Sequence, residues 1–274
     1  MKKEIILFLF MVFFLKISLF SQNETSIPPG TVIYIGDDEV DGNWPPFEYF
    51  IPVAPDQKIE PSGYNIDILE IVAKEYNINF DYINYPWTRV FYELEKGESI
   101  QMVLPVSLNS ERLEKFYSTR AVYQITPSYF YLKEQFPMGI HIEKPEDILE
   151  IGIVNGRVGY NYINFGLNNE DVNRIAKSGR NLFDQLRQKR CAVVLARYET
   201  TAGMSLIGEK LLDSDIGYKT MPGVEKEDFH FLITKNYPYG DELRRIINET
   251  VEKLDNSGEL DKILTRYLIM SEAE

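Results

Sequence analysis

Side chains suited to metal or covalent chemistry are rare in this sequence of 274 residues. The single cysteine, Cys191, cannot close an intramolecular disulfide, and the two histidines, His141 and His230, are too few for a zinc site. Cys191 lies within an apolar run that predicts a buried strand, so its thiol is expected to be inert. No nucleophile and base stand at a recognisable spacing, and no P-loop occurs. The sequence therefore predicts no metal, no cofactor and no disulfide framework.

Arginine and aromatic side chains are better suited to holding a small solute. A planar guanidinium makes two parallel charge-assisted hydrogen bonds to a carboxylate. Flat rings, at 13% of the residues, can enclose an apolar or cationic group with little loss of entropy. Taken by itself, Arg112 is more readily explained as a surface residue paired with Glu111 or Glu114.

The charge of the whole chain limits its partners. The sequence has 29 basic and 42 acidic residues, which give a net charge of −13. Such a surface repels phosphate backbones and anionic lipid headgroups, which argues against nucleic acid and a membrane surface as partners. With 44% hydrophobic residues the chain can fold, and its length suits one large domain or two of roughly 100–150 residues each.

The first 21 residues are typical of an export signal. Lys2 and Lys3 precede an apolar run of 11 residues at 5–15, shorter than the roughly 20 that span a bilayer. We expect cleavage after Ser21, although Leu19, at position −3 relative to the cleavage point, is larger than the small residue usually found there. An uncleaved anchor is the alternative. Removal of three lysines and one glutamate would leave a mature charge near −15. A soluble exported protein that stays with its cell indicates a periplasmic location.

Strands and helices are expected to alternate in the next part of the chain. Prolines throughout 37–62 predict an irregular loop. Apolar residues at helical spacing predict an amphipathic helix over 65–76. The other expected elements are strands at 32–35, 80–83 and 102–104 and a short helix around 90–94 that Gly97 ends.

A second series with the same alternation follows. It consists of a strand at 151–154 that ends at Gly156, a helix at 181–188 and a strand at 191–195. Another strand at 229–233 precedes helices at 243–254 and 260–267. Two α/β lobes are therefore predicted.

The order of these landmarks resembles the extracellular solute-binding proteins of family 3, the amino-acid-type receptors of ABC importers. The resemblance covers nearly the whole chain after the signal, and its strength lies in the order and spacing of short motifs. These motifs are WPPFEY at 44–49, GYNIDI at 63–68, PWTR at 86–89, LEKG at 94–97, SLNSER at 107–112, FYS at 116–118 and GIVNG at 152–156.

The resemblance implies a two-lobed α/β fold of the type II periplasmic-binding (Venus-flytrap) class, with a mixed sheet flanked by helices in each lobe. Lobe closure around the ligand by hinge motion is expected. The expected division is a signal at 1–21, lobe 1 at 28–132 and 225–274, lobe 2 at 133–224, and hinges near 129–133 and 224–230.

The resemblance also implies a ligand site in the first lobe. Arg112 matches the arginine that holds the ligand carboxylate, and Ser107 matches a position that donates a hydroxyl hydrogen bond to the same group. Trp87 falls where the family places an aromatic wall against the ligand. Phe47 or Tyr49 would supply a second wall, although core packing is about equally expected for Phe47.

The second lobe departs from the family pattern. Gly156 is expected to end a strand and open a helix whose N–H groups face the cleft. Arg157 and Val158 follow it, where the family usually has small hydroxylated residues. The family's ammonium-binding acid would fall at Ala196, which has no carboxylate. A buried ammonium without a carboxylate partner is poorly compensated, which disfavours an ordinary amino acid as ligand.

The arginines near the predicted site favour an anionic ligand. Arg112 and Arg157 are expected to face the cleft, whereas Arg89 and Arg197 are more readily explained as surface residues. We therefore expect a carboxylate-bearing ligand that lacks a free amine.

Three functions fit this resemblance. The favoured one is a monomeric periplasmic binding protein, not an enzyme, that delivers its small-molecule ligand to the membrane permease of an ABC importer. A subunit that reports ligand to a membrane sensor is the second. The third is a dehydratase of the cyclohexadienyl type, for which Glu199 is the only acid that we would nominate; a solvated glutamate on a helix is the more frequent role.

Overall fold

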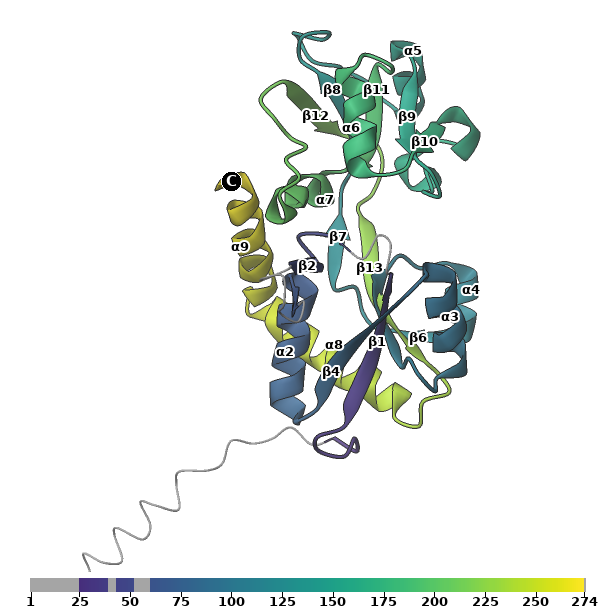
Figure 1. The fold of residues 1–274 in the computed structure, drawn as a ribbon, viewed down its shortest axis with the longest axis vertical. Coiled ribbons are helices and arrows are strands. Elements are labelled where there is room, and N and C mark those ends of the chain that lie inside the picture. The colour runs from purple at the N-terminus through teal and green to yellow at the C-terminus, as the bar shows by residue number, and fades with distance from the viewer. Residues whose placement is uncertain (1–24, 39–42, 52–59, 274) are drawn as a thin grey trace, which may run out of the picture.

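The structure, a computed structural model, describes residues 25–38, 43–51 and 60–273. Within these ranges the chain forms two lobes that are stacked along the long axis of the molecule (Figure 1). The predicted signal at 1–21 lies outside the described residues. No helix in the described part is both long and apolar enough to span a bilayer.

The first lobe contains a mixed sheet of the strands β1 (Val32–Asp38), β4 (Asn79–Tyr85), β5 (Met102–Val106), β6 (Phe116–Ser118) and β13 (Glu227–Thr234). Their order across the sheet is β4-β1-β5-β13-β6. Strand β1 runs parallel to β4 and β5, and β13 runs antiparallel to β5 and β6. The first lobe therefore resumes near the C-terminus, as the resemblance implied.

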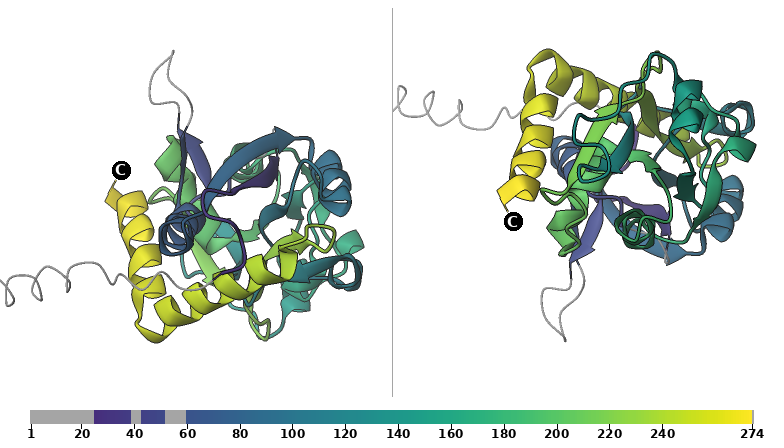
Figure 2. Two further views of the ribbon diagram at one scale, coloured as in Figure 1. Left: turned by 90° about the horizontal axis from the view of Figure 1, so that it is seen from below. Right: turned by 90° about the horizontal axis from the view of Figure 1, so that it is seen from above.

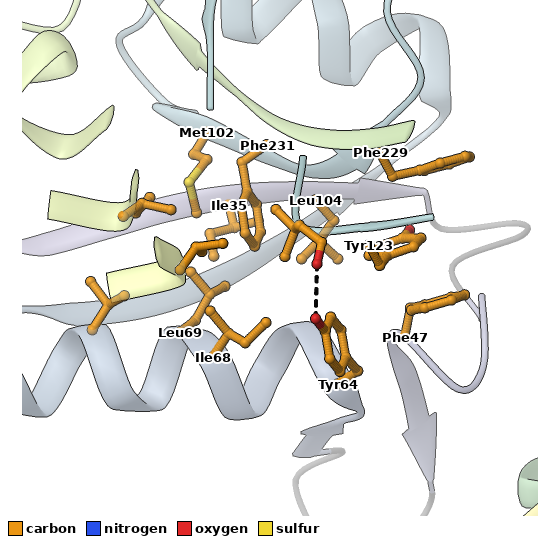
Figure 3. Packing of buried hydrophobic residues seen from close by; sticks show 14 of the residues in the cluster. Ile35, Phe47, Tyr64, Ile68, Leu69, Met102, Leu104, Tyr123, Phe229 and Phe231 are labelled. Carbon is orange, nitrogen blue, oxygen red and sulfur yellow. Dashed lines mark hydrogen bonds between the residues drawn. The ribbon is translucent and has the colours of Figure 1, made fainter. Parts of the chain in front are cut away.

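Helices cover both faces of this sheet. They are α2 (Tyr64–Tyr76), α3 (Trp87–Lys96), α4 (Ser110–Lys115), α8 (Gly240–Asn256) and α9 (Glu259–Ala273). Helices α2, α8 and α9 pack against one another, and α8 and α9 are the yellow helices of Figure 2. Met102 and Leu104 point into the apolar cluster under these helices, which Figure 3 shows, whereas Val103 points into the cluster under α3. This alternation is that of a strand buried on both faces.

The second lobe contains a five-stranded sheet of β8 (Pro127–Leu132), β9 (Val154–Arg157), β10 (Asn173–Ala176), β11 (Val193–Arg197) and β12 (Ile216–Thr220), among the described residues. Its order is β10-β9-β11-β8-β12, with β8 antiparallel to both of its neighbours. Helices α5 (Ile148–Ile151), α6 (Gly179–Arg187) and α7 (Tyr198–Gly203) belong to this lobe.

Two crossing segments join the lobes. In the first, β7 (Tyr123–Ile125) pairs with the start of β13 in lobe 1, and β8 begins two residues later in the sheet of lobe 2. The second crossing lies between the end of β12 and the start of β13. The prediction that lobe 1 extends to residue 132, with a hinge near 129–133, is therefore wrong, because β8 pairs only with strands of lobe 2 in the described sheets.

Two local predictions also need correction. Ile151 ends helix α5 and does not begin a strand, so β9 starts three residues later than expected, at Val154. In the proline-rich stretch the described residues include two short paired strands, β2 (Tyr49–Ile51) and β3 (Glu60–Ser62), where an irregular loop was predicted.

The C-terminal helix makes a further connection between the lobes. Helix α9 packs against α7 and against the 3-10 helix η4 (Met204–Ile207), both in the second lobe (Figure 1). Leu206 and Ile207 of η4 pack against the main apolar cluster of the first lobe. One side of the molecule is thus closed by direct apolar contact, in addition to the two crossing segments.

Candidate functional site

A cavity of about 530 Å³ lies between the lobes, and we call it the cleft. From lobe 1 it is lined by residues of the β1 end, of the 105–109 segment and of helices α3 and α4. From lobe 2 it is lined by the segment after β9 and by the end of β11. The lining residues on which the site description depends are Asp37, Trp44, Glu48, Trp87, Ser107, Arg112, Arg157, Tyr160, Asn164, Arg197, Glu227 and Phe229.

Arg112 and Ser107, two of the residues that the resemblance assigns to the ligand site, lie at one wall of the cleft. Strand β5 ends at Val106, and the side chain of Asn109 then caps helix α4 by accepting a hydrogen bond from the Arg112 backbone N–H, at 2.8 Å. This short turn brings the Arg112 guanidinium back over Ser107, whose carbonyl oxygen accepts a hydrogen bond from Nη1 at 2.5 Å.

The Arg112 guanidinium is half-buried and keeps its charge. Its Cζ lies 5.0 Å from the centre of the Phe91 ring. Burial lowers the pKa of Arg112 from its ordinary value, an effect that the charges of Glu111 and Glu227 oppose. An arginine stays protonated at neutral pH even so. The cleft therefore contains a fixed cationic group with planar donors.

Trp87 also lines the cleft, as predicted. It is the first residue of helix α3, directly after Pro86, and its ring stands edge-on to that of Phe91 at 5.0 Å between centroids. The same Phe91 ring thus supports both Trp87 and Arg112. Proline before the helix start fixes the entry of the chain and so the position of Trp87.

Phe47 and Tyr49 do not line the cleft, so the prediction of a second aromatic wall from either residue is wrong. Phe47 is fully buried and stacks on Tyr123, with 3.6 Å between ring centroids (Figure 3). Tyr49 is buried beside Tyr267 at the other end of the same core. Both rings are core residues: Phe47 packs against Tyr64 of α2 and Tyr123, and Tyr49 packs against Tyr267 of α9.

Trp44 provides the second aromatic wall. It lines the cleft from lobe 1, lies stacked on Phe229 at 6.3 Å, and is tilted against Tyr160 of lobe 2, also at 6.3 Å. Trp44 belongs to the sequence motif at 44–49, but no site role was predicted for it. The signal for it was available, since Trp44 precedes a Pro-Pro pair in the same loop as Phe47.

Two buried carboxylates form part of the lobe 1 wall, and neither was predicted as a site residue. Asp37, near the end of β1, and Glu48 are each 5% exposed. The Asn65 side-chain amide donates a hydrogen bond to Glu48 Oε2. Burial, and after it the charge of Asp37, raise the pKa of Glu48 well above its ordinary value, and the hydrogen bond from Asn65 acts in the opposite direction.

Gly156 does not open a helix, and it does not line the cleft. It lies inside β9, and the chain continues through a turn to the 3-10 helix η2 (Ile163–Phe165). The hydroxyl of Tyr162 accepts a hydrogen bond from the Arg157 backbone N–H at 2.6 Å, which holds the Tyr162 ring over Gly156. A side chain at position 156 would collide with this ring. The glycine is required for packing and provides no free helix N-terminus.

Arg157 lines the cleft from lobe 2, as predicted. Its Nη1 donates a hydrogen bond to the Tyr160 hydroxyl at 2.5 Å, and its Cζ lies 4.5 Å from the centre of that ring. The Arg157 guanidinium and the Tyr160 ring therefore form one unit that faces Trp44 across the cleft.

Arg197 is buried, so its interpretation as a surface residue is wrong. Its Nε and Nη2 donate to Glu227 Oε2 at 2.9 and 2.6 Å, and both side chains are 8% exposed. Asn164 donates to the other oxygen, Oε1, at 2.5 Å. Glu227 begins β13, so this ion pair ties the end of β11 to the second crossing. By contrast, Arg89 is a surface residue as expected, with a side chain that is 55% exposed.

Glu199 and Ala196 lie outside the lining of the cleft. The Glu199 carboxylate accepts hydrogen bonds from the backbone N–H and the hydroxyl of Thr126, at 2.9 and 2.7 Å, in the first crossing. It is therefore not the solvated helix residue that was expected. Ala196 is half-buried at the end of β11 and lines a second, neighbouring cavity.

Among the described residues that line the cleft, three acids face three arginines. Asp37, Glu48 and Glu227 balance Arg112, Arg157 and Arg197 in formal charge. With aromatic rings from both lobes, this lining can enclose a small polar solute by hydrogen bonds, charges and ring contacts. The arrangement is that of a binding site between two lobes.

Comparisons with known proteins agree with this architecture. A probable histidine-binding protein of Neisseria gonorrhoeae is 21% identical over 252 residues, which are 87% of this chain and 84% of that protein. A solved amino acid ABC transporter substrate-binding protein from Streptococcus pneumoniae, bound to L-arginine, has a TM-score of 0.65 at 18% identity over 88% of this chain and 95% of that one. A solved histidine kinase sensor domain with similarity to periplasmic binding proteins has a TM-score of 0.62 at 17% identity over 87% of this chain and 96% of that one.

The fold predicted from the sequence is confirmed: it is the two-lobed type II periplasmic-binding fold, with mixed sheets flanked by helices. The family is shown independently, because residues 39–270 match the bacterial extracellular solute-binding proteins of family 3. The chain therefore belongs to the family 3 extracellular solute-binding proteins.

Proposed function

We propose that this protein is a periplasmic, non-enzymatic binding protein that captures a small carboxylate-bearing solute between its lobes and delivers it to an ABC-type permease. The observation that carries the proposal is the half-buried Arg112 guanidinium, which lies on the cleft wall beside Ser107 and Trp87. A ligand that touches both lobes binds the closed form better than the open form and so shifts the population toward closure.

The charges of the cleft favour an amino-acid-like ligand over an acid without an amine. Neither Arg197 nor Arg89 adds a free positive charge to the cleft, because Arg197 is paired with the buried Glu227 and Arg89 lies on the surface. Asp37 and Glu48 add carboxylates to the cleft wall, where they suit an ammonium or another N–H donor. The names of the relatives, one a probable histidine-binding protein and one bound to L-arginine, support a ligand of this class.

Calorimetry with a panel of amino acids and simple organic acids tests the proposal. Arg112→Ala is expected to weaken binding of the best ligand by at least about tenfold, since a hydrogen bond to a charged group contributes ~1.5–3 kcal/mol. Arg89→Ala is the matched control, because it removes the same charge from an exposed position of α3. Undiminished affinity in Arg112→Ala, or an equal loss in Arg89→Ala, would refute the role of Arg112.

A sensing role is the second candidate, and one observation favours it. A histidine kinase sensor domain shares this fold along nearly its whole length. Neighbouring genes distinguish the two uses: a permease and an ATPase indicate import, whereas a kinase or cyclase indicates sensing.

Dehydratase activity has less support. Glu199, the only acid nominated for it, is engaged by Thr126 in the first crossing and is not among the residues lining the cleft. Turnover of prephenate by the purified protein would overturn the assignment as a binding protein.

A further inference from the structure

A second cavity of about 190 Å³ adjoins the cleft, and we call it the side chamber. It lies between the start of α6, the end of β11, and the α7–η4 segment, and the loop at 43–45 of lobe 1 closes it. Trp44, Arg157, Tyr160 and Arg197 line both the side chamber and the cleft. The two spaces therefore share a border made of two rings and two guanidinium groups.

Apolar side chains form the inner wall of the side chamber. Leu182, Phe183, Leu195 and Leu211 are buried there, and Met204 lies beside them at the edge of the same region of lobe 2. Ala196 contributes only a methyl group at the end of β11. This small side chain leaves the space open next to the border with the cleft.

Most polar side chains that line the side chamber already have partners within the protein, and Glu209 lies 3.6 Å from Arg180. The exception is Trp44 Nε1, a buried donor without a partner in the described residues, at the border with the cleft. The hydroxyls of Thr200 and Thr201 donate to the Arg197 carbonyl oxygen, at 3.2 and 2.7 Å. Ser178 Oγ accepts from the Asn181 backbone N–H at 3.1 Å. Arg197 is paired with Glu227. A polar ligand group would gain few new hydrogen bonds here and would lose its hydration, whereas an apolar group would gain contact with the inner wall.

The volume of the side chamber suits a ring-sized group. An apolar protein cavity of about 150 Å³ accommodates benzene, and the side chamber is slightly larger, at about 190 Å³. A phenyl ring or a branched aliphatic group of similar size would therefore fit, and a single methyl group would leave most of the space empty.

We propose that the side chamber is a subsite for an apolar, ring-sized part of the ligand, whose polar end lies in the cleft. The substrate class is then an amino-acid-like acid with an aromatic or branched apolar side chain. The polar end of this assignment rests on the proposed function, whereas the apolar end rests on the side chamber alone.

L-phenylalanine and L-alanine are suitable probes, because they differ only by a phenyl group. Wild-type protein is expected to bind L-phenylalanine at least about tenfold more tightly than L-alanine in calorimetry, since the ring removes a large apolar area from water. Ala196→Leu, which adds three carbon atoms at the wall of the side chamber beside the border with the cleft, should bring this ratio close to one. Ala202→Leu is the matched control, because Ala202 is also half-buried but is not among the residues lining the chamber; it should keep the wild-type ratio.

Crystals of the wild-type protein exposed to benzene test the apolar subsite without any variant. Density for benzene in the side chamber would support the subsite even if no amino acid or organic acid of the panel binds, an outcome that would defeat the proposed function alone. A side chamber that stays empty with benzene, or a ratio that Ala196→Leu leaves unchanged, would overturn the proposal. Crystals grown with L-phenylalanine that show its ring against Trp87, away from the chamber, would overturn it as well.

Discussion

Removal of Arg197 is expected to destabilise the protein severely, because its partner Glu227 would remain buried without its counter-charge. The two side chains are each 8% exposed, and the Nη2 to Oε2 distance is 2.6 Å. After Arg197→Ala, the carboxylate would keep the hydrogen bond that Asn164 donates to Oε1, but no counter-charge from Arg197. Breaking a buried pair on one side costs about 3–5 kcal/mol. In a protein of this size that loss lowers Tm by roughly 6–20 °C.

Two further variants distinguish the effect of burial on the free energy of unfolding from the effect of ion pairing alone. The double variant Arg197→Met/Glu227→Leu removes both charges and fills the site with apolar atoms, so its stability should match the wild type or exceed it by about 1–4 kcal/mol. Lys262→Ala breaks an ion pair of 2.5 Å whose side chains are 69% and 46% exposed. Despite the shorter distance, this control should lose less than about 1 kcal/mol.

Urea unfolding followed by far-UV circular dichroism and tryptophan fluorescence measures these differences, and coincident curves from both probes justify a single free energy. If Arg197→Ala lost no more stability than Lys262→Ala, then leaving the Glu227 carboxylate buried without a counter-charge would not cost the expected free energy. If the double variant were as unstable as Arg197→Ala, the loss would come from packing and not from an unpaired carboxylate.

Two more predictions concern buried titratable groups. Because the pKa of Glu48 is raised on folding, the native state holds its proton more tightly, and wild-type stability falls as pH rises from the ordinary value of 4.5 through the raised pKa. The shape-matched variant Glu48→Gln should therefore gain stability relative to the wild type over this range in urea unfolding; a difference that does not change with pH would contradict it. Burial raises the pKa of Cys191 to about 11, so iodoacetamide at about pH 8 should label the unfolded chain only, and stoichiometric labelling of folded protein would disprove this.

Local patterns in the sequence predicted the long helices and six of the strands, whereas β6, β7, β8, β10 and β12 were not predicted. The apolar spacing of 65–76 matches helix α2, and Gly97 ends α3 with a φ of 76°, a conformation that glycine adopts without strain. The lobe to which β8 belongs could not be predicted in the same way. Strand β8 pairs with β11 and β12 through residues more than 60 positions apart in sequence. The apolar sequence of β8 does not indicate which strands it pairs with.

Sequence patterns place predicted site residues near one another only where a short segment determines their positions. Ser107 and Arg112 lie within one turn that Asn109 caps, so sequence proximity places them together. Phe47 and Trp44 stand three residues apart in one loop, and the pairing of Phe47 with Tyr123, 76 positions away, decides which of them is buried. The Arg197–Glu227 pair joins two distant segments, which is why Arg197 alone gave no indication of burial.

The position of β13 in the first sheet has a consequence for the order of folding. Lobe 2 is continuous from 127 to 220, so a chain made from its N-terminus contains the whole of that lobe before the other is complete. Lobe 1 lacks the strand between β5 and β6 until residues 227–234 are available. Contacts between segments distant in sequence slow folding, so the half of the cleft that contains Arg112 should be the last part of this protein to reach its native structure.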